Sequence, residues 1–217
     1  MQSPDHSSRG HAEFSPSSLK YCAACAGYQG KEGTSAAAEK GTRIHEAIEV
    51  RDSSNLQSEE EVSIYNEIIS DQDEYLKNYE GKELTESCQE ILLDVALKGT
   101  STYGTCDFLN IYDNTQGVLI DYKTGISVID PPENNWQAKA YTVGCFQKFP
   151  DLESINFIFF VPQRNEILSH TFQRVDLEEL IEDLSGVILK AERVRPKWKD
   201  GAPPLEDLTP TVHCRFC

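Results

Sequence analysis

Short apolar runs alternate with turn residues between residues 82 and 172, and this alternation constrains the fold more than any other feature. The runs of strand length are Glu90–Leu97, Tyr103–Tyr112, Gly117–Lys123, Ile155–Val161 and Glu166–Phe172. A helix is expected over Asn135–Phe149, after the break at Pro131-Pro132. We expect the first three strands to form an antiparallel meander, and the chain to be an α/β protein with a mixed central β-sheet flanked by helices.

Four further helices are predicted from apolar residues at helical spacing. They run from Ser15 to about Cys25, from Thr34 or Ser35 to about Val50, from Ser58 to Tyr79, and from Asp176 onward. Asp176 and Glu179 are expected to form a capping box at the start of the last helix. Its buried face is expected to consist of Leu177, Leu180, Ile181, Leu184, Val187, Ile188 and Ala191.

The length and composition predict one globular domain. The 217 residues are 39% hydrophobic and 26% charged, which provides for one sizeable core. Residues 1–14 are expected to be a disordered leader, and residues 15–217 a single domain. No apolar run has the length of a bilayer span or the character of a signal peptide. We therefore expect a cytoplasmic protein, in the host-cell cytoplasm if a phage encodes it, with no membrane partner.

Asp121 and Lys123 follow the apolar run Val118–Ile120 and are two positions apart, so both side chains leave the same face of a strand. Metal-assisted hydrolysis of a phosphodiester needs a carboxylate that holds the cation and an ammonium group that acts on water and offsets charge. A surface ion pair at a strand end has the same pattern. Asp107 favours the first interpretation, because a hairpin would fold it back beside Asp121.

Two converging carboxylates predict a Mg²⁺ or Mn²⁺ site, and an imidazole from His45 would favour Mn²⁺. The alternative for His45 is an ordinary polar position on its helix. Gln137 and Tyr141 are spaced i and i+4 and therefore share one face of the following helix. They are candidates to hold a DNA phosphate or brace the lysine, or they form the edge of the core.

The charge of the chain argues against non-specific binding of nucleic acid. The formal net charge is -16, whereas affinity for phosphates comes from lysine and arginine. One locally basic segment is a candidate DNA contact, and its cations are Lys190, Arg193, Arg195, Lys197 and Lys199. The alternative is a solvated helix end whose cations interact favourably with the helix dipole.

The seven cysteines are interpreted as thiols or metal ligands rather than as a disulfide framework, because the chain is expected to be cytoplasmic. Cys22 and Cys25 form one Cys-x2-Cys pair, and Cys214 and Cys217 form another at the opposite end of the chain. Together they make a four-thiolate site for an iron-sulfur cluster or zinc if the ends meet. The alternative is that the N-terminal pair consists of buried thiols.

Four motifs, in their order along the chain, resemble the RecB-like branch of the PD-(D/E)XK nuclease superfamily. They are Gly41-Thr42-Arg43-Ile44-His45-Glu46, Gly104-Thr105-Cys106-Asp107, Asp121-Tyr122-Lys123 and Gln137-Ala138-Lys139-Ala140-Tyr141. The resemblance covers roughly residues 15–217 and implies a restriction-endonuclease-like core. It also implies a metal held by His45, Asp107, Asp121 and the main-chain carbonyl of Tyr122, a catalytic Lys123, and supporting roles for Gln137 and Tyr141.

The resemblance bears on Glu90 and on the cysteines. Glu90 stands where many relatives carry a glutamate on the first strand, although an exposed strand carboxylate explains it equally well. A subgroup that includes AddB-type and CRISPR-adaptation exonucleases binds a [4Fe-4S] cluster through one upstream and three downstream cysteines, and Cys25 best resembles the upstream ligand. The third downstream cysteine is absent here. Either Cys22 is the fourth ligand, or the chain is cut short, or His213 contributes and the metal is zinc.

These features predict a Mg²⁺- or Mn²⁺-dependent deoxyribonuclease with DNA as its substrate. The resemblance implies an exonuclease of recombination, repair or phage DNA processing, with any protein partner unidentified. The cysteine site would join the two chain ends as a structural staple. Two alternatives belong to other functional classes: a catalytically silent DNA-end or protein-binding module on the same fold, or a zinc-stapled interaction protein.

Overall fold

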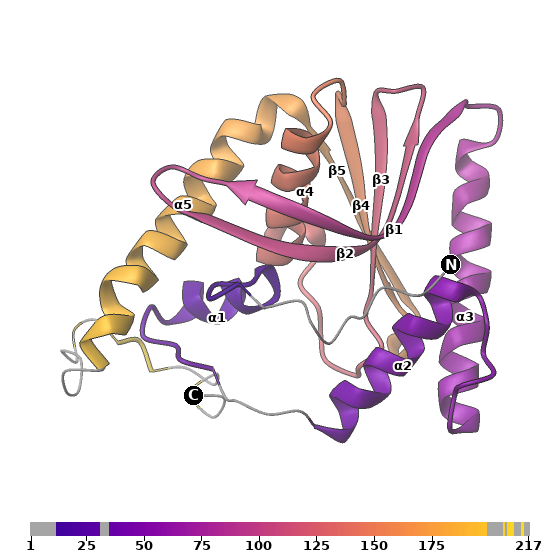
Figure 1. Cartoon of the computed structure of the whole chain (residues 1–217), viewed down its shortest axis with the longest axis horizontal. Helices are drawn as coiled ribbons and strands as arrows, with labels where there is room; N and C mark the ends of the chain where they lie inside the picture. The colour runs from indigo at the N-terminus through magenta and orange to yellow at the C-terminus, as the bar shows by residue number, and fades with distance from the viewer. Residues whose placement is uncertain (1–11, 31–34, 199–205, 207, 211–213, 215–217) are drawn as a thin grey trace.

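The computed structural model describes residues 12–30, 35–198, 206, 208–210 and 214. Its centre is a five-stranded β-sheet with the strand order β1-β2-β3-β4-β5 (Figure 1). The strands are β1 (Leu84–Ala96), β2 (Ser101–Tyr112), β3 (Gln116–Tyr122), β4 (Ser154–Val161) and β5 (Glu166–Gln173). Strands β3 and β4 pair in parallel and the other neighbours pair antiparallel. The predicted mixed sheet and its antiparallel meander are confirmed, with β1 starting at Leu84 rather than at Glu90.

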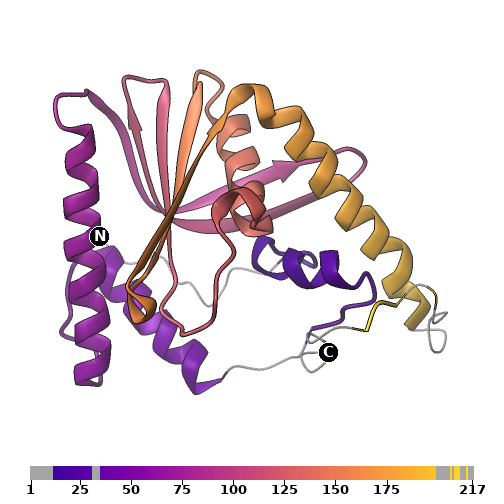
Figure 2. The same cartoon turned by 180° about the vertical axis from the view of Figure 1, so that it is seen from behind.

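Helices cover both faces of this sheet. The α-helices are α1 (Leu19–Ala24), α2 (Ala36–Val50), α3 (Glu59–Leu76), α4 (Trp136–Lys148) and α5 (Leu177–Val194). Short 3-10 helices lie at Pro16–Ser18, Lys77–Tyr79, Pro132–Asn134, Pro162–Arg164, Arg174–Asp176 and Arg195–Trp198. Helices α4 and α5 lie on one side of the sheet and α3 on the other, an arrangement that both views show (Figure 2). No helix in the described part of the chain is long and apolar enough to cross a membrane.

The sheet separates two hydrophobic cores, and β4 contributes to both. Phe157 and Phe159 belong to the core that includes α4 and α5, whereas Ile158 and Phe160 belong to the core that includes α2 and α3. All four side chains are fully buried. Successive residues of a strand point to opposite faces, so an uninterrupted apolar run is expected of a strand that is covered on both sides.

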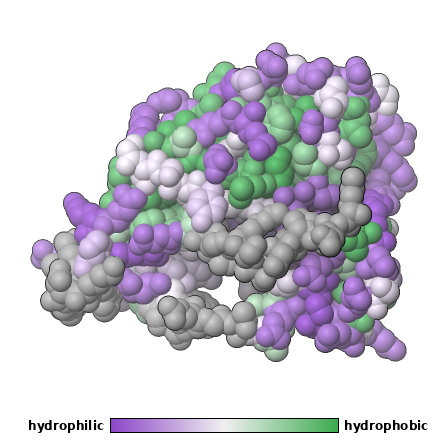
Figure 3. Space-filling model, viewed as in Figure 1, coloured by the Kyte–Doolittle hydropathy of each residue, from purple (hydrophilic) through white to green (hydrophobic). Residues whose placement is uncertain are grey.

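The edge strand β1 is less protected than the centre of the sheet. Leu84 and Leu92 are 52% and 45% exposed, and hydrophobic residues reach the surface on the side of the molecule shown in Figure 3. The exposed carboxylates of Glu86 and Asp94 interrupt this apolar edge. Charged side chains on an edge strand oppose pairing with strands of other molecules.

The structure differs from the sequence predictions at two boundaries. Asp176 does not cap α5 through its side chain; it accepts a hydrogen bond from the Gln173 backbone N–H at 2.8 Å and so forms a capping box one turn earlier, with Gln173. The boundary predicted after residue 14 lies too far along the chain, because Phe14 is buried in the larger core. Its carbonyl accepts a hydrogen bond of 2.6 Å from the Thr102 hydroxyl.

Candidate active site

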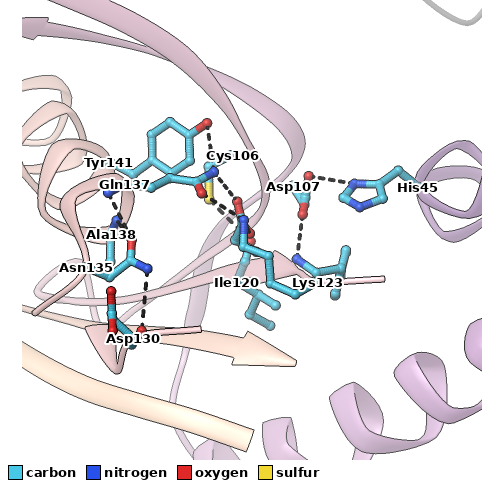
Figure 4. Close-up of polar contacts among 12 residues, drawn as sticks. His45, Cys106, Asp107, Ile120, Lys123, Asp130, Asn135, Gln137, Ala138 and Tyr141 are labelled. Carbon is cyan, nitrogen blue, oxygen red and sulfur yellow. Dashed lines mark hydrogen bonds and ion pairs between the residues drawn. The ribbon is translucent and has the colours of Figure 1, made fainter. Parts of the chain in front are cut away.

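Asp107 on β2 is fixed by two hydrogen-bonding partners. Its Oδ1 lies 3.0 Å from Nδ1 of His45 on α2, and its Oδ2 accepts a 2.6 Å hydrogen bond from the backbone N–H of Tyr122. Figure 4 shows His45 reaching Asp107 from the helix on one side of the site. The hairpin predicted from the sequence brings Asp107 to the end of β3, since Phe108 pairs with Ile120.

Asp121 and Lys123 form an ion pair at the end of β3, with 2.5 Å between Asp121 Oδ2 and Lys123 Nζ. The amide of Gln137 on α4 contacts both partners: its Nε2 donates to Asp121 Oδ1 at 2.8 Å, and its Oε1 accepts from Lys123 Nζ at 2.7 Å. Asp121 is 3% exposed. A single amide therefore fixes the relative position of the carboxylate and the ammonium group.

The start of α4 sets the position of Gln137. Asn135 is the N-cap residue, and its side-chain oxygen accepts hydrogen bonds from the backbone N–H groups of Gln137 and Ala138. One helical turn later, the Tyr141 hydroxyl lies 3.5 Å from Gln137 Nε2. The shared face predicted for Gln137 and Tyr141 is present, and Gln137 makes the closer contacts with the charged pair.

Glu90 on β1 lies across from Asp107, between the paired residues Gln89–Phe108 and Ile91–Cys106. Its φ of 49° is in the left-handed region, which is unfavourable for a residue with a side chain and is unusual within a strand. Ligand atoms of His45, Glu90 and Asp107 all lie within 4.8 Å of one another. The sequence offered one signal for this position, a glutamate on the first strand.

Helix α2 is held close to the end of β3, and this fixes where His45 lies. A Cβ added to Gly41 would be 3.2 Å from the hydroxyl oxygen of Thr124, so a larger residue would require the Thr124 side chain to move by a few tenths of an ångström. Two residues further along α2, the Arg43 guanidinium donates to the buried Glu61 carboxylate of α3 at 2.6 Å. This ion pair joins α2 to α3.

The electrostatics of the site are dominated by buried like charges. Burial raises the pKa of Asp121, and Asp107 adds to this effect, although Lys123 opposes it. Burial alone would lower the pKa of His45, but the charge and hydrogen bond of Asp107, together with Asp121 and Glu90, outweigh burial and raise it to about 9. The raised pKa of His45 means that the surrounding carboxylates favour positive charge at the imidazole.

The residues present fit a divalent cation. Asp121 Oδ2 is buried and lies 2.5 Å from Lys123 Nζ, so the ammonium group already balances its charge. The ligand atoms of His45, Glu90 and Asp107 lie within 4.8 Å of one another and so offer a hard cation several donors at one point. Oxygen ligands with one imidazole are a donor set for Mg²⁺ or Mn²⁺. His45, Glu90 and Asp107 are therefore the residues that lie close enough together to hold one ion.

Two pockets meet at the His45–Asp107 pair. The first, here called the β3 pocket, has a volume of about 350 Å³ and includes Asp121, Lys123 and Gln137 in its lining. The second, here called the α2 pocket, has a volume of about 360 Å³ and lies against α2 and β1. Of the predicted metal ligands, His45 and Asp107 line both pockets, whereas Asp121 and Tyr122 line the β3 pocket alone.

The cations predicted at the end of α5 differ in their surroundings where the structure describes them. Arg195 is engaged within the chain: its guanidinium donates to the carbonyl oxygens of Tyr28 at 2.7 Å and Glu13 at 3.0 Å, and lies 4.2 Å from the ring centroid of Phe14. The structure thus differs from the prediction for Arg195, whose donors tie the N-terminal segment to α5. Lys190 and Arg193 are exposed. Lys199 and the side chain of Lys197 lie outside the described part of the chain.

The predicted cysteine site is described in part. Cys22 is buried in the larger core, 3.6 Å from an Arg195 nitrogen, and burial raises its pKa. The Cys25 sulfur accepts a hydrogen bond from the Thr209 backbone N–H at 3.4 Å, which places residues near the C-terminus beside α1. Cys214 is exposed, and Cys217 lies outside the described residues.

Comparison with known proteins places the chain in a family. A search of curated proteins gave no match. A protein from Eubacterium rectale named "Putative exonuclease" superposes with a TM-score of 0.47 at 14% identity, over 78% of this chain and 71% of the other. The protein SSO0001 superposes with a TM-score of 0.29 at 14% identity, over 68% of this chain and 86% of the other. Residues 11–217 match the family described as "Protein of unknown function (DUF2800)", and the chain is therefore a member of the DUF2800 family.

Proposed function

We propose that the protein is a Mg²⁺- or Mn²⁺-dependent deoxyribonuclease of the RecB-like branch of the PD-(D/E)XK superfamily. One observation carries this proposal: an ammonium group lies 2.5 Å from a buried carboxylate in a pocket that also contains Asp107 and His45. Three separate elements, α2, β2 and β3, bring these four residues together with Gln137 of α4. A surface ion pair at a strand end would not need a buried, braced carboxylate.

The chemistry assigned to the site is attack of water on a DNA phosphodiester. A divalent cation held by His45, Asp107 and Asp121, with Glu90 and the Tyr122 carbonyl as further ligand candidates, would supply positive charge to the phosphate and acidify water. Lys123 orients the attacking water and offsets the negative charge that develops on the phosphate. Gln137 fixes the position of the Lys123 ammonium group relative to the Asp121 carboxylate through its two hydrogen bonds.

We also propose that the cysteines near the two chain ends form a metal or [4Fe-4S] staple that includes Cys25 and Cys214. The contact between Cys25 and Thr209 supports this, because it brings the C-terminal segment to the N-terminal cysteine pair. Cys25 is the better ligand candidate of that pair, since it is partly exposed, whereas Cys22 is buried beside Arg195. Such a staple would act through stability.

Purified protein is expected to degrade linear DNA when Mn²⁺ or Mg²⁺ is present and to lose this activity in excess EDTA. The physical reason is that the charge needed at the phosphate comes from the cation. Loss of labelled linear single- and double-stranded DNA would be followed on gels. Asp107→Ala should be inactive, whereas Asp94→Asn, an exposed carboxylate on β1, should match the wild type. Intact DNA under all metal conditions would favour the catalytically silent module instead.

Mn²⁺ is expected to stabilise the folded protein. At a concentration 100 times its Kd, a ligand specific for the native state adds about 2.7 kcal/mol, which corresponds to a rise of about 5–10 °C in Tm for a protein of this size. Differential scanning fluorimetry of the metal-free protein, before and after titration, measures this shift. His45→Gln and Asp107→Asn should reduce the rise, and Asp94→Asn should keep it. An equal rise in all four proteins would place the bound ion elsewhere.

A further inference from the structure

Tyr122, the last residue of β3, contacts two of the candidate metal ligands at once. Its backbone N–H donates to Asp107 Oδ2 at 2.6 Å. Its ring meets the imidazole of His45 edge to face, with 6.0 Å between the ring centroids and 74° between the two planes. The position of Tyr122 therefore affects where the Asp107 carboxylate and the His45 imidazole stand relative to each other.

The far end of the Tyr122 side chain is held by α3. The Tyr122 hydroxyl donates a hydrogen bond of 3.1 Å to Oε1 of Gln72, which lies on that helix. Tyr122 is 3% exposed and Gln72 is 1% exposed, so water does not compete for this bond. One side chain thus connects α3 to the two candidate ligands on α2 and β2.

Packing alone does not account for a glutamine at position 72. Its Nε2 is buried and has no hydrogen-bond partner among the residues that the structure describes. A buried polar group without a partner costs free energy, and an apolar side chain of similar size would avoid that cost. The ring of Tyr122 already stacks on Phe160, with 6.3 Å between the centroids. What Gln72 adds is a directional contact, because a hydrogen bond fixes the hydroxyl at one point whereas stacked rings can slide.

We propose that Gln72 and the Tyr122 hydroxyl are positioning residues of the metal site. They hold the Tyr122 ring in one place, and so fix both the backbone N–H that orients Asp107 and the ring edge beside His45. The ligand atoms are then arranged before the ion binds. Hydrogen bonds behind the ligands of a metal typically account for about 10–100-fold in metal affinity. This inference rests on the proposed function and adds to it the residues that set the metal affinity.

Calorimetric titration of metal-free protein with Mn²⁺ tests this role, alongside urea denaturation without metal. Tyr122→Phe keeps the ring and removes the hydroxyl, and it should raise the Kd for Mn²⁺ at least about tenfold. Gln72→Met removes the acceptor and should have the same effect. Tyr122→Phe/Gln72→Met replaces both hydrogen-bonding partners by apolar groups, so its urea midpoint should equal or exceed that of Tyr122→Phe. Its Kd should nevertheless stay raised, whereas a purely structural role predicts that affinity recovers with stability.

Tyr112→Phe makes the same chemical change away from the metal site. Tyr112 is 7% exposed, and its hydroxyl accepts a hydrogen bond of 2.9 Å from Asn110 Nδ2. Tyr112 is the last residue of β2 and lies roughly 16 Å along that strand from Asp107. This variant should lower the urea midpoint much as Tyr122→Phe does and leave the Kd for Mn²⁺ unchanged.

The outcomes separate this inference from the proposed function. Wild-type affinity for Mn²⁺ in Tyr122→Phe/Gln72→Met, or an equal loss of affinity in Tyr112→Phe, would overturn the positioning role and leave the nuclease function standing. Wild-type protein that binds neither Mn²⁺ nor Mg²⁺ would overturn the metal site, and with it the proposed function and this inference together.

Discussion

Lys123→Ala should lower the rate of DNA cleavage by about 10²–10³-fold, the effect expected when a group that stabilises developing charge is lost. In the structure, the Lys123 ammonium group contacts Asp121 and Gln137, so it is already positioned before substrate arrives. The side chain of Lys123 is 21% exposed, and its removal leaves the hydrophobic cores intact. Cleavage of labelled linear DNA under single-turnover conditions measures the chemical step.

The matched control for this variant is Lys148→Ala at the exposed end of α4, which should keep wild-type activity. Lys123→Ala should also retain most of the rise in Tm on adding Mn²⁺, because the proposed ligands are still present. This combination distinguishes a chemical role from a role in metal binding. Retention of more than about a tenth of wild-type activity by Lys123→Ala would contradict its assignment.

Phe146→Ala should destabilise the fold by about 3–5 kcal/mol, the range for removal of a fully buried aromatic ring. Phe146 on α4 has no exposed surface, and the Arg174 guanidinium lies 4.7 Å from its ring centroid. Arg174 also donates to the Phe149 carbonyl at 2.8 Å and to the Leu152 carbonyl, so it binds the end of α4. Removing the ring leaves a cavity beneath this arginine.

Phe149→Ala is the control for that cavity, because it makes the same chemical change at a half-buried position one residue beyond α4. Its cost should be less than half that of Phe146→Ala, since less apolar surface returns to water. Urea denaturation monitored by fluorescence measures both values. Equal costs for the two variants would show that the ring of Phe146 contributes no more than a half-buried one.

The sequence was sufficient to predict the mixed sheet and the positions of several candidate site residues on it. Strand β4 has an uninterrupted apolar run, and α4 follows Asn135, a residue with a strong N-cap preference, so local chemistry determines both elements. The pair Asp121 and Lys123 was placed on one strand face by the two-residue period alone. Short-range rules of this kind need no knowledge of the remaining chain.

The features that were missed depend on tertiary contacts. In the sequence, Arg195 is one of several cations near a helix end. Its contacts with Tyr28 and Glu13 could not be predicted, because those residues are far from Arg195 in the sequence. Asp176 fits the capping pattern of α5, yet a 3-10 helix precedes α5 in the structure. The Asp176 side chain accepts a hydrogen bond from the Gln173 backbone N–H and so caps that 3-10 helix instead. The left-handed φ of Glu90 is likewise invisible in a strand pattern, because the irregularity lies across from Asp107 on the partner strand.

The division of the interior into two cores has a consequence for cooperativity. His45 belongs to α2, which packs in one core, while Gln137 belongs to α4, which packs in the other. Regions that share few buried contacts can open separately, each with its own free energy. A cation bound between His45 and the sheet would be lost when the α2–α3 layer opens. Occupancy of the site would therefore slow amide hydrogen exchange in α2 and α3 and couple the opening of that layer to the rest of the protein.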